Sequence, residues 1–436
     1  MIAYLYPPLG GTGRLRTLKF AKYLPKFGWK PFVLTPKRGV WPSKCDESEG
    51  VINNVEVIRT GYFDIISTIR KLAGFNPDPS ITILEQAKII SSSNFFRRRF
   101  IHFMCKLVDE LTFPDRHIGW YPYAISDGIK TIHEKEIDII YSTSSPQTNH
   151  LIAHNLKQKT GLPWIADFRD LWSENHHIQH SYLRRLLDKK LEIGTIKDAD
   201  VLLTVSLPLA EQLSLLHSHL KNKVYVITNS FDPDDFDLSN MEVSDKFTIT
   251  YTGTFRHETN NPEPLFKAIS LLAMEDKIKL DDFRIRFCGN YGSEFCSLAE
   301  KHGLKNVVTN CGWVPHAESV RQQCQSTLLL LLIENTTKER GVLTAKVFEY
   351  LGARRPILMV GYTKGALADL LEDTKAGVAV DPSDISKLKR ELLNWYNEYK
   401  ENGYIKYRGI SDKISKYNSI NTTKNLANLL DQLINV

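Results

Sequence analysis

Apolar and helical segments alternate along almost the whole chain, and this alternation constrains the fold more than any other feature. The predicted strands are 2–6, 31–35, 55–59, 137–143, 164–167, 201–205, 224–228, 247–251, 284–288, 307–310, 327–333, 356–360 and 377–380. Helical patterns lie between most of them. Strands joined by helices form parallel sheets, because a parallel connection must cross back over the sheet. The sequence therefore predicts α/β structure with helices on both faces of parallel sheets.

A polar, aspartate-rich stretch interrupts the alternation near the middle of the chain. Residues 229–246 include Asn-Ser-Phe-Asp-Pro-Asp-Asp-Phe-Asp, and the alternation restarts at Phe247. The 436 residues also exceed the ~250–300 that one hydrophobic core usually supports. We therefore expect two doubly wound, Rossmann-like domains facing a cleft. Residues 1–228 form the first, 229–246 the linker and 247–411 the second.

Composition excludes several classes of protein. With 42% hydrophobic and 24% charged residues, the chain resembles an ordinary globular protein rather than a disordered one. The longest aliphatic run, 328–333, is far shorter than the ~18–20 residues that span a bilayer. No basic segment precedes the first apolar run, so a secretory signal is not expected. The sequence predicts a cytoplasmic protein.

Neither the cysteines nor the histidines form a metal-binding pattern. The six cysteines lie far apart without a C-x-x-C pair, which indicates free thiols in a reducing compartment. His176, His177 and His180 are clustered, but they lie in a polar stretch without partner cysteines. We expect no metal.

Positive charge is concentrated in the first half of the chain. Residues 1–200 hold 28 Lys and Arg against 21 Asp and Glu, whereas the remainder is nearly balanced. This asymmetry predicts that only the first domain faces something anionic.

A glycine-rich turn follows the first predicted strand. Gly10, Gly11, Thr12 and Gly13 precede Arg14 and open a helix, so backbone N–H groups can face a ligand. Ligands of parallel sheets bind beyond the carboxyl ends of strands. The turn is not G-x-G-x-x-G, and no acidic residue ends the second strand, so nicotinamide binding is disfavoured. A tight turn without a ligand is the alternative.

Two carboxylates flank a guanidinium after the strand at 164–167. Asp167, Arg169 and Asp170 precede Trp172, an aromatic residue able to pack on a sugar face. Their place at a strand end favours a functional site. A structural Arg–Asp network that holds a loop is the alternative.

Small residues follow two strands of the second domain. Thr252, Gly253 and Thr254 precede Arg256, and Gly289 follows another strand. Small residues let a phosphate approach, and Arg256 is able to bind it in a bidentate manner. Glycine after a strand is also common for steric reasons, so this signal is weak alone.

The segment 341–352 carries the most informative pattern. Thr344 or Gly341 would cap a helix whose first turn presents unpaired N–H groups to an anion. Lys346 and Glu349 are three residues apart and share one helix face. A cation for phosphate and a carboxylate for ribose hydroxyls suit a nucleoside diphosphate. A surface ion pair is the alternative.

An aromatic and basic cluster lies at 96–100. Phe96 and Phe100 share a helical side, with Arg97, Arg98 and Arg99 largely turned away. The pattern suits an anchor for anionic lipid or lipid-diphosphate acceptors. No nucleic-acid module accompanies it. A core-facing stripe with solvated arginines is the alternative.

Taken in order, the motifs resemble those of the GT-B glycosyltransferases of family 4. They are Tyr-Pro-Pro with Gly-Gly-Thr-Gly-Arg, Asp-Phe-Arg-Asp-Leu-Trp, Tyr-Thr-Gly-Thr, Gly-Trp-Val-Pro-His and Lys-Val-Phe-Glu-Tyr-Leu. The bacterial branch that builds polysaccharides and glycoconjugates is the most similar. The resemblance implies metal-independent, retaining transfer from a nucleotide sugar, with no other cofactor. The second domain would bind this donor, and the first a glycan or lipid-linked acceptor. The last helix, about 422–435 within 412–436, would cross back to the first domain.

The resemblance also implies roles for individual residues. Glu349 matches the ribose-binding glutamate, Lys346 and Arg256 match the cations at the donor phosphates, and residues 342–344 would meet the diphosphate and sugar. His316 follows the Gly-Trp-Val-Pro turn, where it is placed to contact the donor.

One departure keeps other functions open. Gly341 stands where the family has its first glutamate, which puts the contact to the transferred sugar in doubt. The alternatives are a nucleotide-sugar 2-epimerase of the same fold and a non-catalytic binding subunit. In the favoured interpretation Lys346 and Arg256 stabilise the leaving diphosphate, and Asp167, Arg169 and Asp170 orient the acceptor or sugar.

Overall fold

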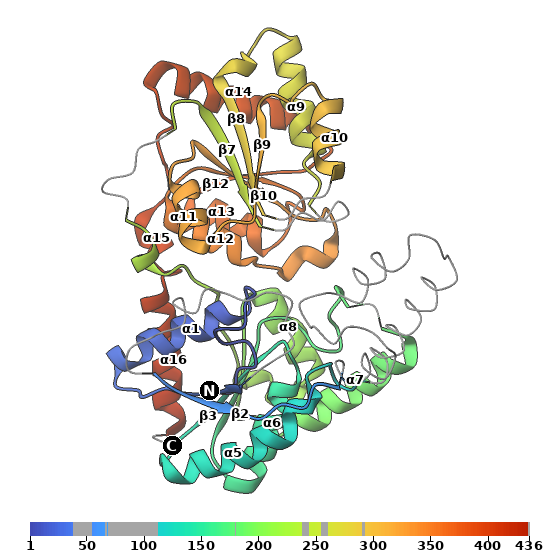
Figure 1. The fold of residues 1–436 in the computed structure, drawn as a ribbon, viewed down its shortest axis with the longest axis vertical. Helices are drawn as coiled ribbons and strands as arrows, with labels where there is room; N and C mark the ends of the chain where they lie inside the picture. Colours follow the sequence, from blue (N-terminus) through green and yellow to red (C-terminus); the bar gives the residue numbers. More distant parts are fainter. Residues whose placement is uncertain are drawn as a thin grey trace. The chain divides into compact units, whose positions relative to one another are not determined.

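The computed structural model describes residues 1–37, 55–65, 68, 112–178, 180–237, 244–253, 260–289 and 293–434 (Figure 1). The predicted cluster at 96–100 and the predicted donor residues Thr254 and Arg256 lie outside these residues. The chain divides into an N-terminal unit, Met1–Ile227 with Thr423–Val436, and a C-terminal unit, Thr228–Thr422. Within the described residues, no helix is long and apolar enough to cross a bilayer.

The N-terminal unit is built on parallel strands. Its strands are β1 (Phe32–Pro36), β2 (Glu56–Thr60), β3 (Ile140–Ser144), β4 (Trp164–Phe168), β5 (Val201–Thr204) and β6 (Val224–Val226). β1 pairs with β2, and β3 to β6 pair in sequence order. The strand expected at 2–6 is reduced to a parallel bridge, in which Ile2 pairs with both Leu34 and Ser142. Ile2 thus joins β1 to β3.

Helices of the N-terminal unit pack on both faces of its sheet. They are α1 (Arg14–Tyr23), α5 (Tyr121–Glu134), α6 (Thr148–Thr160), α7 (Tyr182–Ile196), α8 (Leu207–Leu216) and α16 (Ser419–Ile434), with 3-10 helices η1 (Leu24–Phe27), η3 (Ile118–Trp120) and η4 (Ser218–Lys223). One core joins Trp164 and Phe168 of β4 to residues of α5 to α8. The other face of β4, through Ile165, packs against α1 and α16.

The last helix completes this second face. Leu426 and Leu430 of α16 pack with Phe20 of α1 and Leu24 of η1 in one buried cluster. Figure 1 shows α16, in red, beside α1, in blue. The four-residue spacing of the two leucines places them on one side of the helix. The predicted return of the last helix to the first domain is confirmed.

The C-terminal unit contains one sheet of six parallel strands in the order β12-β11-β10-β7-β8-β9. The strands are β7 (Phe247–Thr252), β8 (Phe283–Cys288), β9 (Val308–Gly312), β10 (Leu328–Leu332), β11 (Ile357–Val360) and β12 (Gly377–Val380). The helices are α9 (Glu263–Met274), α10 (Ser293–Lys301), α11 (His316–Cys324), α12 (Ala345–Ala353), α13 (Ala366–Thr374), α14 (Ile385–Asn402) and α15 (Ser411–Ser415), with 3-10 helices η5 (Pro233–Asp235), η6 (Leu280–Asp282) and η7 (Thr337–Gly341).

The five leucines of β10 show how this sheet is buried on both sides. Leu328, Leu330 and Leu332 pack in a core with α9, α10 and α14. Leu329 and Leu331 pack in a second core with α11, α12, α13 and α15. Because side chains alternate along a strand, an unbroken apolar run is what a doubly covered strand requires. The predicted α/β fold with doubly wound sheets is confirmed.

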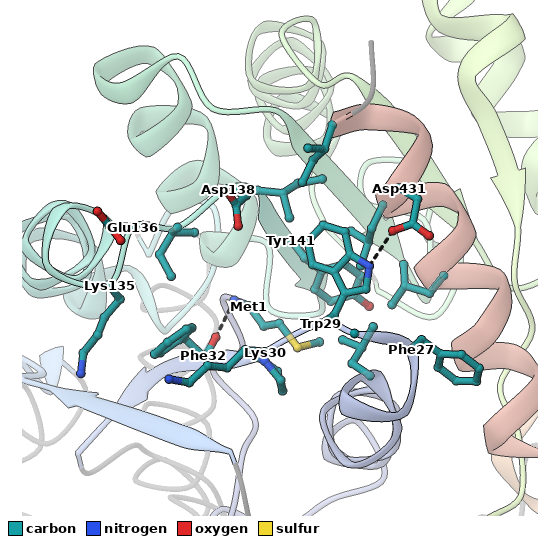
Figure 2. Close-up of a pocket in the computed structure, with 18 residues that line it drawn as sticks. Met1, Phe27, Trp29, Lys30, Phe32, Lys135, Glu136, Asp138, Tyr141 and Asp431 are labelled. Atoms are coloured by element: carbon teal, nitrogen blue, oxygen red, sulfur yellow. Dashed lines mark hydrogen bonds between the residues drawn. The ribbon is translucent and has the colours of Figure 1, made fainter.

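A cavity of about 510 Å³ opens at the amino ends of the N-terminal strands (Figure 2). The amino group of Met1 donates a hydrogen bond to the carbonyl oxygen of Phe32 at 2.7 Å, and burial lowers the pKa of this amino group to about 5. Across the cavity, the Trp29 indole donates to Asp431 of α16 at 2.9 Å. Ligands of parallel sheets bind at the opposite, carboxyl edge. We therefore place the candidate site elsewhere.

His150 of α6 is a neutral part of the N-terminal core. Its Nδ1 lies 2.8 Å from the Ser142 hydroxyl, which also accepts a hydrogen bond from the Trp164 indole at 2.8 Å. The side chain is fully buried, and this burial lowers its pKa to about 3.

We predict that His150 lowers the stability of the protein as the pH falls below 6.5. Below pH 6.5 the unfolded chain binds a proton at His150 that the folded chain does not bind until about pH 3. The wild type should lose about 2 kcal/mol relative to His150→Gln between pH 6.5 and about 5. Urea unfolding across this range measures the difference. His133→Gln, at an exposed histidine of α5, is the control, and parallel pH profiles of wild type and His150→Gln would contradict the prediction.

Candidate active site

Two glycine turns lie next to each other at the carboxyl edge of the C-terminal sheet. Gly253 follows β7 and donates its N–H to the carbonyl oxygen of Cys288, the last residue of β8, at 2.8 Å. Gly289 follows β8 and donates to Gly312 of β9 at 2.7 Å. This edge is where the ligand of a parallel sheet is expected.

Lys346 reaches this edge from the first turn of α12. Its ammonium donates to the Tyr251 hydroxyl at 2.9 Å and lies 4.7 Å from the centre of the Tyr251 ring. Gly253 has φ +122°, and a Cβ on it would come within 3.0 Å of the Lys346 Nζ. Glycine is therefore required there for its backbone angle, and its lack of a side chain leaves room for the lysine. The result is a cation fixed at the end of β7.

Glu349 is held one turn further along α12 by two residues of α11. Its Oε2 accepts from Gln323 Nε2 at 3.1 Å, and its Oε1 lies 3.4 Å from His316 Nε2. His316 and Gln323 are seven residues apart, or two helical turns, so they share one face. Gln323 also donates to the Thr252 hydroxyl at 3.4 Å. The carboxylate is thereby tied to α11 and to the end of β7.

Tyr350 fixes α12 against the sheet. Its buried hydroxyl accepts from the Thr252 N–H at 3.1 Å and donates to the Leu330 carbonyl oxygen at 3.1 Å. Burial raises the pKa of Tyr350, so the hydroxyl remains a donor. Tyr350, Tyr251 and Gln323 were not among the predicted site residues. The seven-residue spacing from His316 was the signal for Gln323, whereas both tyrosines read as ordinary core aromatics.

The start of α12 leaves a polar edge beside Lys346. Thr344 is the N-cap residue, but its hydroxyl makes no capping hydrogen bond and has no partner among the described residues. Before it, Leu343 is buried, and Val342 follows η7, which ends at Gly341. The N–H groups of a first helical turn attract anions. The structure thus brings together Lys346, Glu349, His316, Thr252 and Gly253, with residues 342–344 at the adjoining helix start.

In the N-terminal unit, Arg169 fastens the glycine turn to the end of β3. It donates to the carbonyl oxygens of Gly13 at 2.6 Å and Ser144 at 2.9 Å, and also to that of Ser145. Arg14 donates to Gly11 O at 3.0 Å within the same turn. This turn, residues 10–13, leads directly into α1. Arg169 therefore sets the shape of the turn in this structure.

Asp167 lies in the core beneath this turn. Its two oxygens accept from Arg16 at 2.7 and 3.0 Å, from Thr143 at 3.1 Å and from the Tyr141 hydroxyl. The side chain is fully buried, whereas Asp170 is exposed. The contacts of Asp167 match the structural alternative, although its partner is Arg16 rather than Arg169. Catalytic roles for Asp167, Arg169 and Asp170 stay predictions.

A comparison with protein families finds a match in the C-terminal unit. Residues 234–412 match the family model of the glycosyl transferases group 1. The match covers most of the C-terminal unit, which carries the sequence pattern of this family. A comparison with curated proteins finds no significant match.

Solved structures show the GT-B fold over the whole length of this glycosyltransferase. A glycosyltransferase from Rickettsia africae has 13% identity and a TM-score of 0.63, covering 99% of this chain and 98% of that chain. Anabaena Alr3699/HepE in complex with UDP-glucose has 12% identity, a TM-score of 0.61 and the same coverage. The lipopolysaccharide outer core galactosyltransferase WaaB has 15% identity and a TM-score of 0.56, again with this coverage. At these identities the likeness shows the fold alone.

The buried and exposed aspartates of the glycosyltransferase should differ in their effect on stability. Asp167→Ala removes the carboxylate that pairs with the buried Arg16 guanidinium, which should cost about 3–5 kcal/mol of unfolding free energy. Asp170→Ala, at the exposed neighbour, should change it by less than about 0.5 kcal/mol. Urea unfolding monitored by circular dichroism gives both values. Equal effects of the two substitutions would remove the structural role of Asp167.

Proposed function

We propose that this glycosyltransferase moves a hexose from a UDP-sugar to a glycan or lipid-linked acceptor, with retention, in the assembly of bacterial surface glycoconjugates. The arrangement that supports it best is Lys346 and Glu349, on successive turns of α12 and held at the end of β7. This spacing suits a nucleoside diphosphate. The Lys346 ammonium faces the charged phosphates, and the Glu349 carboxylate faces the ribose hydroxyls. The Anabaena protein of the same fold in complex with UDP-glucose favours uridine as the base.

In this proposal the C-terminal unit binds the donor. Glu349 accepts hydrogen bonds from the ribose hydroxyls, and His316 and Gln323 keep its carboxylate in place. Lys346 and the first N–H groups of α12 face the diphosphate, and Arg256 supplies a second cation. Gly253, Gly289 and residues 342–344 let the phosphates approach the backbone.

The chemistry then depends on electrostatic stabilisation of the leaving group. Negative charge develops on the diphosphate as the glycosidic bond breaks, and fixed cations and helix N–H groups lower its energy. The acceptor hydroxyl attacks from the same face, and the leaving phosphate oxygen takes its proton. No side-chain base is then needed. The N-terminal unit binds the acceptor through residues 10–14 and Asp170, with Arg169 and Asp167 as positioning residues.

The donor site is tested by nucleotide binding. Lys346→Ala and Glu349→Gln should each weaken UDP binding about tenfold or more, because a hydrogen bond to a charged group contributes about 1.5–3 kcal/mol. Calorimetric titration with UDP, GDP and ADP measures affinity and base preference. Lys277→Ala and Glu372→Gln, at exposed positions of the same unit, are matched controls.

Two results would overturn the proposal. Unchanged affinity in both α12 variants would remove the assigned donor site. Failure of the wild type to bind any of the three nucleotides would remove the proposed activity.

The outward-facing apolar side of helix α7 supports the proposal that the acceptor lies in a membrane. Tyr182, Leu183, Leu186, Leu187 and Ile193 form the α7 apolar face, and each is between 40% and 72% exposed. Figure 1 shows α7 along α6 at the side of the N-terminal unit. An outward apolar face is the reverse of what a helix on a globular core normally presents.

The inward side of α7 is polar. Arg184 pairs with Asp188 at 3.1 Å and donates to the Pro114 carbonyl oxygen at 2.6 Å. Glu192 is fully buried, where it accepts from Ser173 and lies 3.2 Å from His217 Nε2. The acidic residues of α7 are thus turned inward.

The exposed charges of α7 are positive. Arg185, Lys189 and Lys190 are exposed beside the α7 apolar face, and Lys189 lies 3.5 Å from Glu174. A basic rim on an apolar helix face suits the surface of an anionic membrane. We propose peripheral attachment of the enzyme to the inner face of the cytoplasmic membrane through α7. The predicted cluster at 96–100 remains a second candidate for the same contact.

Vesicle flotation tests this attachment. The wild type should float with vesicles that contain phosphatidylglycerol and much less with pure phosphatidylcholine. Leu183→Ser with Leu187→Ser should reduce the bound fraction about tenfold or more, since burying one leucine contributes about 1.5–3 kcal/mol. Leu207→Ser with Leu215→Ser, at exposed leucines of α8, is the matched control. Equal flotation of both double variants would exclude α7 as the contact.

A further inference from the structure

Two cysteines lie side by side at the carboxyl edge of the C-terminal sheet. Cys288 ends β8, and Cys311 lies in the neighbouring strand β9. Phe287 pairs with Asn310, but Cys288 pairs with Gly312, so Cys311 is the extra residue of a one-residue register shift. Cys288 and Cys311 are therefore neighbours across the two strands, and neither forms a disulfide.

The surroundings make Cys311 the reactive thiol of the pair. β9 is the edge strand of the sheet, and Cys311 is half-buried, whereas Cys288 is 3% exposed. The neighbouring Cys288 side chain lowers the pKa of Cys311 to about 7, with Arg286 favouring the thiolate and burial and Glu318 opposing it. The same contact, with burial, raises the pKa of Cys288. A thiolate near neutral pH is an effective nucleophile in disulfide exchange.

We propose that Cys288 and Cys311 form a reversible disulfide that weakens donor binding. The Cys311 thiolate attacks a low-molecular-weight disulfide such as oxidised glutathione, forms a mixed disulfide and releases one thiolate. Cys288 then loses its proton and attacks the Cys311 sulfur, which releases the second thiol. Two protein thiols are oxidised, and one glutathione disulfide is reduced to two thiols.

The pair is connected to the donor site through the backbone. The Cys288 carbonyl oxygen accepts from the Gly253 N–H at 2.8 Å, and Gly289 donates to Gly312, the residue after Cys311, at 2.7 Å. A disulfide joins the sulfurs at about 2.05 Å and fixes the separation of the two Cβ atoms, so its formation constrains the ends of β8 and β9. This constraint acts on the two glycine turns, one of which lies against the Lys346 side chain. This coupling rests on the proposed donor site.

Oxidation followed by peptide mapping and titration tests the proposal. The full-length protein, incubated with oxidised glutathione, should yield a cross-linked peptide pair containing Cys288 and Cys311. Cys324, which is buried, should stay reduced and be alkylated after denaturation. The cross-link should form faster above the Cys311 pKa than below it. UDP affinity should fall about tenfold and recover with dithiothreitol.

Two variants separate the pair from the other thiols. Cys311→Ser should form no such cross-link and keep its UDP affinity in oxidised glutathione. Cys296→Ser, at an exposed cysteine of α10, should respond like the wild type. Absence of the Cys288–Cys311 cross-link in the wild type would overturn the proposal, as would a cross-link that leaves UDP affinity unchanged.

Failure of the donor site is distinguishable from failure of the pair. If the reduced wild type does not bind UDP, the donor site and its coupling to the thiols are both wrong. The peptide map alone then decides whether the disulfide forms.

Discussion

The buried pair of Arg16 and Asp167 holds the N-terminal unit together. A charged carboxylate in a protein core is costly unless it is paired and fully hydrogen-bonded, and Asp167 meets this condition with donors from α1 and β3. Arg16 also donates to the Ile227 carbonyl oxygen at 2.9 Å, just after β6. One ion pair thus fixes α1, β3, β4 and the segment after β6. The glycine turn precedes α1, so its position depends on the same pair.

In the C-terminal unit, the charged residues at the sheet edge are hydrogen-bonded to neutral side chains. Lys346 and Glu349 are charged residues near the end of a sheet whose strands are buried on both faces. Tyr251 is a neutral partner of Lys346 and Gln323 a neutral partner of Glu349. Tyr350 fixes the helix that carries both charged residues to the sheet. Since all six strands are parallel, their carboxyl ends share one edge, and residues far apart in the sequence meet there.

The sequence predicted the sheets because period and length are local properties. Each predicted strand from 247–251 to 377–380 agrees with an observed strand to within about two residues, well inside the usual uncertainty of element ends. Segment 2–6 is the exception, since only Ile2 bridges to its neighbours. The 341–352 pattern likewise predicted a helix with Lys346 and Glu349 on successive turns, because helical spacing is fixed.

Contacts between distant residues could not be predicted in this way. Asp167 was expected beside Arg169, two residues away, but pairs with Arg16, which is 151 residues distant. The apolar pattern of α7 indicated a helix without showing that its leucines face outward, because buried ion pairs decide that orientation. The contact between Cys288 and Cys311 depends on a one-residue register shift, which no spacing in the sequence reveals.

The return of α16 has a consequence for the order in which the chain folds during synthesis. Four residues of α16, from Leu426 to Leu430, complete a core whose other buried members lie between Phe20 and Ile227. A ribosome therefore makes more than 420 residues of this chain before that core can close. The C-terminal unit is continuous from Thr228 to Thr422, so all of its strands emerge before the last helix does. The half synthesised first is thus the half completed last, and its apolar face needs protection throughout translation.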